Sequence, residues 1–325
     1  MSKESILYIA PFFERGVLKE NSTYNVMGLS EDYDIVCRPI GAKNTDNPLI
    51  SEMISKISNK KCDYLIIHSK PTDFCYHSGF KKCVGITHLK TNLIEDTNYR
   101  NYFGLMDSVY HDSSFVVDGL GNLEPFVNES EYKKSDKKND GSFRFLIDGE
   151  PNVYEDIFKL VCAYIEEFRA EESVELSIRM PQHVNVNQFK EVLTPMIKGI
   201  RKGNNGVSAN INFNNFWFEK TKLLEHYNEF DCIINCSLYN RWSRPVIDFG
   251  FLGKRSISLL DGLNISEAFA YGLSDNNDSP RGIHPSFSIR SIRTQLREAI
   301  TKDTIFDTSK FTKQQLLSNF RKILL

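Results

Sequence analysis

The sequence has no long apolar run, no surplus of charge of one sign and no paired cysteine motif. None of its apolar stretches approaches the roughly 20 residues that span a bilayer, and its start lacks a signal-peptide pattern, so we expect a chain that is neither membrane-spanning nor secreted. The 40 Lys and Arg residues are balanced by 42 Asp and Glu residues, which excludes a whole-molecule field that attracts polyanions. The seven cysteines are scattered and include no Cys-x-x-Cys pair, a pattern that favours reduced thiols in the cytoplasm over a disulfide framework.

Metal-binding patterns are missing as well. The seven histidines show no His-x-x-His or His-Glu-x-x-His spacing, and no Asp-x-Asp pair stands at the end of a predicted strand. We therefore expect no protein-bound metal and no resident cofactor.

The composition of the chain is that of a folded protein. Hydrophobic residues make up 41% and charged residues 25% of the 325 residues, which argues against a disordered or coiled-coil chain. This length is large for a single core, so two domains are expected.

The first part of the chain has the pattern of an α/β domain. Short β-rich apolar runs, which we predict to be strands at 5–10, 33–38, 63–68 and 83–88, alternate with longer segments of helical period. Residues 128–142, NESEYKKSDKKNDGS, include one aromatic and no aliphatic side chain. Such a stretch buries too little surface to order itself, so it is predicted to be a linker or a mobile loop.

The alternation restarts after this stretch. Strands are predicted at 142–147, 174–180, 207–212, 231–237 and 256–260, with helices at 153–168 and near 187–199, 219–227 and 244–252. The predicted organisation is a domain at 1–127, a linker at 128–142, a second domain at 143–305 and a C-terminal helix within 306–325. Since parallel sheets bind ligands beyond the carboxyl ends of their strands, we expect a site between the two domains.

The segment 231–262 gives the strongest indication of chemistry. Its strand is followed by a helix that Ser243 can cap and that has Pro245 in its first turn. A helix N-terminus at this edge of a sheet favours an anion such as a diphosphate. Asp248, one turn further, could accept hydrogen bonds from both hydroxyls of a ribose. The alternative is that Asp248 only balances neighbouring basic residues on a solvated surface.

Residues 245–257, PVIDFGFLGKRSI, resemble the "LP-hydrophobic-hydrophobic-EAMACGKPVI" signature of nucleotide-sugar-dependent glycosyltransferases of the GT-B fold, in particular the retaining group of bacterial type. Residues 142–180 are similar to the segment that opens the donor domain of this family. Residues 311–324, FTKQQLLSNFRKIL, resemble its closing helix, and residues 83–120 resemble the end of its acceptor domain. The resemblance covers most of the chain, and every motif in it is degenerate.

This resemblance implies a fold of two Rossmann-like domains that face each other across a cleft, with the C-terminal helix crossing back to the first domain. It also implies the metal-independent transfer of a hexose or pentose from a nucleotide diphosphate sugar, most commonly a UDP-sugar. The second domain would hold the donor and the first the acceptor, and the transfer would proceed with retention.

The resemblance assigns roles to residues of the second domain. Asp248 matches the residue that binds the ribose, whereas Asn240 stands at the position of a catalytic glutamate and cannot act as a carboxylate. The donor loop that begins at Gly149 lacks the basic residues that the family offers to the diphosphate. The negative charge of the diphosphate must therefore be compensated by other basic residues, and the nearest candidates are Arg179, Arg241 and Arg244.

In the first domain, His68 and His88 stand at the ends of predicted strands. The resemblance places His88 near a residue that contacts the transferred sugar, where it could orient a hydroxyl group or relay the proton of the acceptor. Arg15 and Gly16 follow the first strand, where the family has a glycine-rich turn that faces the phosphates. These two residues and His68 are candidates for contacts with a phosphate or the acceptor, and the alternative for each is an ordinary structural role.

The sequence leaves the identity of the acceptor open. The Lys-, Asn- and Ile-rich composition and the length resemble bacteriophage enzymes that glycosylate hydroxymethylated bases of DNA, which favours a DNA acceptor, and a glycan or a lipid-linked sugar is an alternative. A second alternative is a degenerate member that binds a nucleotide or glycan without turnover. A third is a sugar-phosphate epimerase, which would need a paired histidine and carboxylate that the sequence does not reveal.

Overall fold

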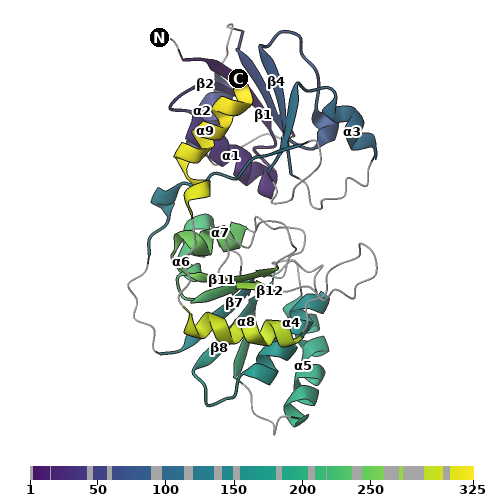
Figure 1. Cartoon of the computed structure of the whole chain (residues 1–325), viewed down its shortest axis with the longest axis vertical. Coiled ribbons are helices and arrows are strands. Elements are labelled where there is room, and N and C mark those ends of the chain that lie inside the picture. Colours follow the sequence, from purple (N-terminus) through teal and green to yellow (C-terminus); the bar gives the residue numbers. More distant parts are fainter. Residues whose placement is uncertain are drawn as a thin grey trace. The chain divides into compact units, whose positions relative to one another are not determined.

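The computed structural model divides into two compact units (Figure 1). Unit 1 consists of Met1–Glu129 and Ser309–Leu325, and unit 2 consists of Ser130–Thr308. The residues that the structure describes are 3–14, 16–41, 47–56, 61–88, 97–112, 120–134, 141–148, 154–180, 185–203, 209–216, 218–235, 244–259, 271–273, 289–302 and 308–325.

Unit 1 is built on a six-stranded sheet whose order is β2-β1-β3-β4-β5-β6. All neighbouring strands are parallel. The strands are β1 (Ser5–Ala10), β2 (Asp34–Pro39), β3 (Tyr64–His68), β4 (Lys82–Thr87), β5 (Ser108–His111) and β6 (Gly121–Asn122). The helices are α1 (Val17–Leu29), α2 (Pro48–Ser55), α3 (Thr97–Phe103) and α9 (Lys313–Leu324). Strand β3 is buried along its whole length, which explains why its sequence is a continuous apolar run rather than an alternating one.

Helix α9 completes unit 1 although it follows all of unit 2 in the sequence. Thr312 caps the helix by accepting a hydrogen bond from the N–H of Gln315 at 3.3 Å. Its apolar stripe is buried in the same core as β1 and consists of Leu316, Phe320, Ile323 and Leu324. The predicted return of the C-terminal helix to the first domain is therefore confirmed.

Unit 2 is built on a second six-stranded parallel sheet, with the order β12-β11-β10-β7-β8-β9. Its strands are β7 (Phe143–Asp148), β8 (Val174–Arg179), β9 (Asn210–Asn214), β10 (Cys232–Ile234), β11 (Arg255–Leu259) and β12 (Tyr271–Leu273). Its helices are α4 (Tyr154–Glu167), α5 (Val186–Gly203), α6 (Lys220–Tyr227), α7 (Arg244–Phe251) and α8 (Ile289–Thr301). The α/β class predicted for both halves is confirmed.

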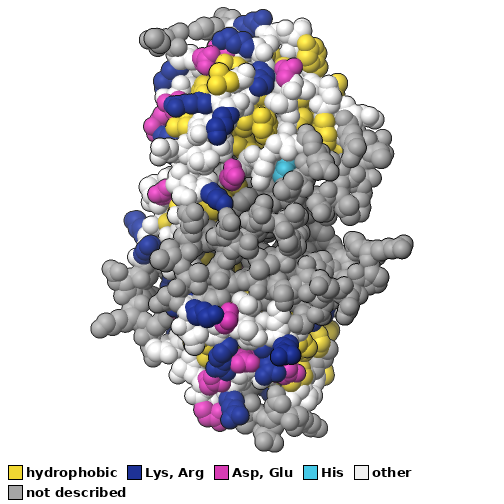
Figure 2. Space-filling view, in the orientation of Figure 1, with side chains coloured by type: hydrophobic (Ala, Val, Ile, Leu, Met, Phe, Trp, Pro, Cys, Tyr) yellow, Lys and Arg dark blue, Asp and Glu magenta, His cyan; other side chains and the backbone are white. Residues whose placement is uncertain are grey.

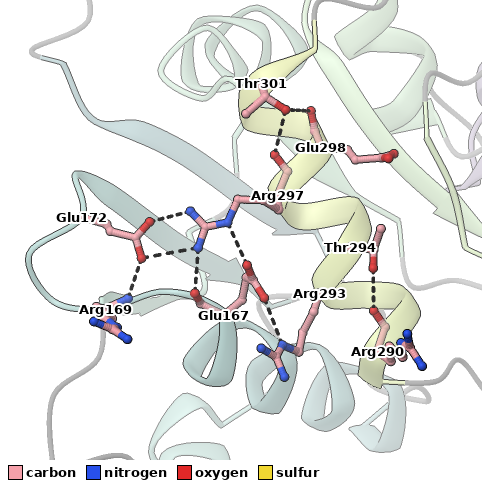
Figure 3. Close-up of polar contacts among 9 residues, drawn as sticks. All are labelled: Glu167, Arg169, Glu172, Arg290, Arg293, Thr294, Arg297, Glu298 and Thr301. Atoms are coloured by element: carbon pink, nitrogen blue, oxygen red, sulfur yellow. Dashed lines mark hydrogen bonds and ion pairs between the residues drawn. The ribbon is translucent and has the colours of Figure 1, made fainter.

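Helices α4 and α8 of unit 2 are joined by ion pairs (Figure 3). Nε of Arg297 donates to Glu167 at 2.8 Å, and its Nη1 donates to Glu172 at 2.5 Å. Arg293, one turn earlier, also donates to Glu167, at 3.0 Å. The guanidinium of Arg297 lies 4.6 Å from the ring centroid of Phe168. These contacts fix α8, whose buried apolar residues are few, to the end of α4.

The surface is mixed in charge. On the face shown in Figure 2, Lys and Arg side chains lie among Asp and Glu side chains, in keeping with the formal net charge of −2. Among the helices in the described ranges, none is both long enough and apolar enough to cross a membrane.

Candidate functional site

The order of the strands indicates where each unit can bind a ligand. The direction of chain progression reverses between β7 and β10 in unit 2, and between β1 and β3 in unit 1. Open parallel sheets bind ligands outside the carboxyl ends of their strands at such reversals. The side chains that follow these strand ends are therefore the candidates in each unit.

In unit 2, Asp248 lies in the second turn of α7, the helix that follows β10. Its carboxylate is 1% exposed and is bonded to three side chains. Nζ of Lys220 donates to Oδ2 at 2.5 Å, Nε of Arg244 donates to Oδ1 at 3.1 Å, and the hydroxyl of Tyr132 donates to Oδ1 at 2.5 Å. Asp248 is thus paired with a neighbouring cation, as the structural alternative predicts, but in a buried position rather than on a solvated surface. A buried carboxylate of this kind must stay paired, so a group that displaces one of its donors has to take that donor's place.

Tyr132 belongs to the stretch predicted to be a linker. Its ring packs against Phe251 of α7 with 5.1 Å between centroids, and its hydroxyl accepts a hydrogen bond from Nη2 of Arg244 at 3.3 Å. The start of this stretch therefore contributes a side chain to unit 2.

A second polar cluster of unit 2 joins the ends of β7 and β8. Asp148 and Arg179 are register partners at these ends, and Oδ2 of Asp148 accepts from Nη2 of Arg179 at 2.5 Å and from the hydroxyl of Tyr227 at 2.6 Å. Burial acts to lower the pKa of Arg179, but the charge of Asp148, the interaction with Tyr227 and the hydrogen bonds to both residues together outweigh it, and the pKa is raised. Burial raises the pKa of Tyr227 well above its usual value. Arg179 is therefore cationic and Tyr227 neutral at physiological pH.

In unit 1, the ends of three neighbouring strands converge on the carboxylate of Asp112, which follows β5. Its Oδ1 lies 2.7 Å from Nδ1 of His88, after β4, and its Oδ2 lies 3.2 Å from Nε2 of His68, the last residue of β3. The amide of Asn21 on α1 donates to Oδ2 at 2.6 Å. Nδ1 of His68 in turn lies 2.9 Å from the hydroxyl of Tyr8 on β1. His68 is completely buried, whereas 11% of the His88 side chain is exposed.

The charge of Asp112 decides where the imidazole protons lie. Burial acts to raise the pKa of Asp112, but the charge of His88 and hydrogen bonds from both histidines outweigh it and hold this pKa well below its usual range. An ionised carboxylate only accepts hydrogen bonds, so Nδ1 of His88 and Nε2 of His68 must carry protons. In the neutral form of His88 the lone pair is therefore on Nε2.

Gly16 is the N-cap residue of α1 and has a φ of 120°, a value that other residues rarely adopt. No side chain caps this helix start, and a Cβ on Gly16 would meet no described atom within 4 Å. Among the described residues, the backbone at Gly16, in the connection from β1 to α1, is therefore open to close approach.

The structure brings some of the predicted site residues together. Arg244 and Asp248 are in contact on α7, with Pro245 beside Arg244 in the first turn, and His68 and His88 share Asp112. Arg179 lies in a separate pairing with Asp148. Five predicted residues lie outside the described residues, namely Arg15, Gly149, Asn240, Arg241 and Ser243.

Sequence reasoning missed the partners that these residues have. Lys220, Tyr132 and Asp112 are absent from the predicted site, although each bonds to a predicted residue. Signals in the sequence could have found two of them. Asp112 follows the short run Val109-Tyr110-His111, and Lys220 begins a helix after a predicted strand.

Two open hollows in the described surface of unit 2 lie away from these clusters. One of about 640 Å³ is lined by residues of α4 and α8, including Glu167, Arg293 and Arg297, and one of about 470 Å³ shares Arg297 with it and is also lined by Glu172. Neither is lined by Asp248, Arg179 or their partners. Within the described ranges, no group of three or more His, Cys, Asp or Glu side chains is arranged to hold a metal ion.

No protein-family model matches the chain, and no curated protein matches it in sequence. Solved structures do match it over its whole length. HepE from Anabaena, solved with UDP and glucose, has a TM-score of 0.62 and 9% identity and covers 99% of each chain. An α-glucosyltransferase solved with UDP and a 13-mer DNA containing a HMU base has a TM-score of 0.55 and 11% identity and covers 99% of this chain and 100% of that chain. AviGT4, a glycosyltransferase involved in avilamycin A biosynthesis, has a TM-score of 0.54 and 9% identity. It covers 99% of this chain and 97% of its own. At such identities the likeness shows the fold, which is GT-B as the sequence resemblance implied.

Proposed function

We propose that this GT-B protein transfers a sugar from a nucleotide diphosphate sugar, with UDP as the nucleotide, to a hydroxyl group of an acceptor. The observation that carries the proposal is that each unit gathers buried, charged side chains at the carboxyl ends of its parallel strands, around Asp248 in unit 2 and around Asp112 in unit 1. Parallel sheets bind their ligands at this edge. UDP complexes among structures of the same fold support the choice of donor.

Unit 2 is proposed to hold the donor. Asp248 accepts hydrogen bonds from the ribose hydroxyls. Two groups face the diphosphate. The first is the arginines, Arg179, Arg241 and Arg244, and the second is the start of α7 at Ser243 and Pro245. Cations and helix N–H groups stabilise the charge of the leaving diphosphate, so the transfer of a hexose or pentose needs no metal ion. The loop at Gly149 and the amide of Asn240 are proposed to line the sugar.

Unit 1 is proposed to hold the acceptor. In the transfer, the bond between the anomeric carbon and the diphosphate oxygen breaks with its electron pair leaving on the nucleotide, and the acceptor oxygen bonds to that carbon. Nε2 of His88 accepts the proton of the acceptor hydroxyl or a hydrogen bond from the sugar. Asp112 and the buried His68 position the imidazole, and Arg15 and Gly16 form the loop that the acceptor or a phosphate approaches. By the family resemblance, the anomeric configuration is retained.

We propose a hydroxymethylated base of DNA as the acceptor. The α-glucosyltransferase of the same fold that was solved with DNA containing a HMU base supports this choice. A base within a duplex would have to be flipped out to reach the site. The proposal predicts that binding to duplex DNA with hydroxymethylated pyrimidines weakens steeply between about 50 and 200 mM salt. Salt-independent or absent binding would exclude DNA and leave a glycan or lipid-linked acceptor.

The test of the donor is an assay of nucleotide release from UDP-, GDP- and ADP-sugars, with the Asp248→Ala variant as the control. Release of one nucleotide by the wild-type protein and loss of that release in the variant would support the transferase. Tight binding of a nucleotide sugar without turnover under any acceptor would identify a non-catalytic binding protein instead.

A second candidate function is the epimerisation of a nucleotide sugar. The observation that favours it is the pairing of His88 with Asp112, because a base of this kind can remove the proton from the carbon that is to be inverted, to which a proton then returns on the opposite face. Incubation of the donor sugar in D₂O distinguishes the two functions, since only epimerisation introduces deuterium into recovered nucleotide sugar.

A further inference from the structure

The two oxygens of Asp248 differ in their partners. Oδ1 accepts from the hydroxyl of Tyr132 and from Nε of Arg244, while Oδ2 accepts from Nζ of Lys220 alone among the described side chains. Loss of the Lys220 contact would therefore leave Oδ1 bonded and the buried charge still compensated by Arg244. A buried carboxylate that keeps one cation escapes most of the penalty of an unpaired charge.

The cations at the carboxyl ends of the unit 2 strands differ in their freedom to move. Arg244 is 10% exposed and bonds to both Asp248 and Tyr132. Arg179 is 16% exposed and bonds to Asp148 and, at 3.4 Å, to the carbonyl oxygen of Phe216. Lys220 is 29% exposed, and Asp248 is the one partner to which its ammonium donates in the described ranges.

Lysine is suited to a change of partner. Its ammonium is a point charge on a flexible stem, whereas the arginine fork is held by the geometry of its hydrogen bonds. The ammonium of Lys220 also lies 5.7 Å from the ring centroid of Tyr132, a contact that does not fix the direction of its N–H groups. Lys220 is at the start of α6, after β9, so it stands at the sheet edge where the donor is proposed to bind.

We infer that Lys220 binds the diphosphate of the donor and exchanges partners when it does so: its ammonium leaves Oδ2 of Asp248 for a phosphate oxygen, and the freed Oδ2 accepts the ribose hydroxyls. The inference rests on the proposed function, and it supplies a cation that the donor loop lacks. No buried charge loses its last partner in the exchange, because Arg244 stays on Oδ1 and the diphosphate compensates Lys220.

The exchange couples recognition of the ribose to recognition of the diphosphate. A nucleoside alone has to compete with Lys220 for Oδ2, whereas a nucleoside diphosphate offers Lys220 a new partner. The preference of the protein for UDP over uridine should therefore depend on Lys220.

The experiment is calorimetric titration of UDP and uridine into the full-length wild-type protein and three variants. Lys220→Gln keeps a hydrogen-bond donor beside Oδ2 but removes the charge, and Lys220→Arg keeps the charge. Lys222→Gln is the matched control, since Lys222 is exposed on the same helix. Thermal unfolding of each variant shows that it is folded.

We expect Lys220→Gln to weaken UDP binding by about tenfold or more, as for the loss of a charge-assisted hydrogen bond, and to leave uridine binding unchanged or tighter. Lys220→Arg should retain most of the affinity for UDP, and Lys222→Gln should change neither ligand. An equal loss of UDP and uridine affinity in Lys220→Gln would overturn the inference, because Lys220 would then only hold Asp248 in place. Unchanged UDP binding in that variant would also overturn it, while leaving the proposed function intact. Absence of binding of UDP, GDP and ADP to the wild-type protein would overturn both.

Discussion

Nδ1 of His88 lies 2.7 Å from Oδ1 of Asp112, and this contact fixes the proton of the imidazole on Nδ1. We predict that Asp112→Asn releases this constraint, because an amide can donate as well as accept. In wild-type protein labelled with ¹⁵N-histidine, the neutral His88 ring should show protonation at Nδ1, and the variant should show a mixture of tautomers. If His88 acts as the base, kcat should fall by about 10²–10⁴-fold with little change in KM.

The exposed His77, which has no contact with Asp112, serves as the internal reference for these spectra. An unchanged His88 tautomer in Asp112→Asn would contradict the assigned role of the carboxylate, whatever the activity of the variant.

Two glycines in helices should respond oppositely to the same substitution. A Cβ on Gly28 of α1 would lie 2.4 Å from Cδ2 of Leu316 on α9, so Gly28→Ala should destabilise the protein by about 1–3 kcal/mol. A Cβ on Gly199 of α5 meets no described atom within 4 Å, so Gly199→Ala should stabilise it by roughly 0.5–1 kcal/mol through helix propensity. Urea unfolding of both variants measures the two effects, and a stabilising effect of Gly28→Ala would contradict the packing of α9 on α1.

The ion pairs of α8 should contribute salt-dependent stability. Arg297 bonds to Glu167 and Glu172 and is 41% exposed, so Arg297→Ala should destabilise unit 2 by about 1–2 kcal/mol at low salt and by less in 1 M NaCl. Arg290, at the start of α8, lines the hollow between α4 and α8 as Arg297 does and serves as the control. Arg290→Ala should change the free energy of unfolding by less than about 0.5 kcal/mol. Equal effects of the two substitutions at both salt concentrations would contradict the contacts shown in Figure 3.

Asp63 should make the stability of unit 1 depend on pH in the acid range. The ammonium of Lys81, and then the N–H and hydroxyl of Ser5, donate to its carboxylate and lower its pKa to about 2. The unfolded chain has a pKa near 3.9 at such a residue, so the stabilisation is complete above about pH 4 and is lost as the pH falls toward 2. The difference in Tm between wild type and Asp63→Asn should therefore be constant from pH 7 to 5 and shrink between pH 4 and 2. A difference that persists at pH 2 would show that the charge of Asp63 is not its source.

Much of the fold is local in the sequence and could be predicted from it. Strand β1 has the bounds predicted, and β3, β4 and β8 are within one residue of theirs, because buried parallel strands are short apolar runs that polar residues delimit. Helix α8 was missed. Its buried residues are only Ile292, Leu296 and Ala299, and its ion pairs to Glu167 of α4 join residues 126 and 130 positions apart in the chain, which residue spacing does not reveal. Strand β6 was also missed, since two residues that pair with β5 have no periodicity of their own.

The candidate site also has parts that are local in the sequence, which could be predicted, and parts that depend on distant contacts, which could not. Asp248 could be found from the sequence because the helix start and the carboxylate lie within a few residues of each other. Its partners could not, since Lys220 is 28 residues and Tyr132 116 residues away in the chain. The histidines were found at strand ends, but the pairing of both with Asp112 depends on the order of β3, β4 and β5 in the sheet. Residue spacing does not contain that order.

The position of α9 in the chain has a consequence for biosynthesis. Its stripe of Leu316, Phe320, Ile323 and Leu324 closes the core of unit 1, yet the ribosome makes all of unit 2 before it. At about 5–20 residues per second, the nascent unit 1 waits roughly 10–40 s with the α1 surface around Gly28 uncovered. Chaperones that recognise apolar surface have that interval in which to engage it, and a premature stop in unit 2 would leave the first half of the polypeptide permanently unfinished.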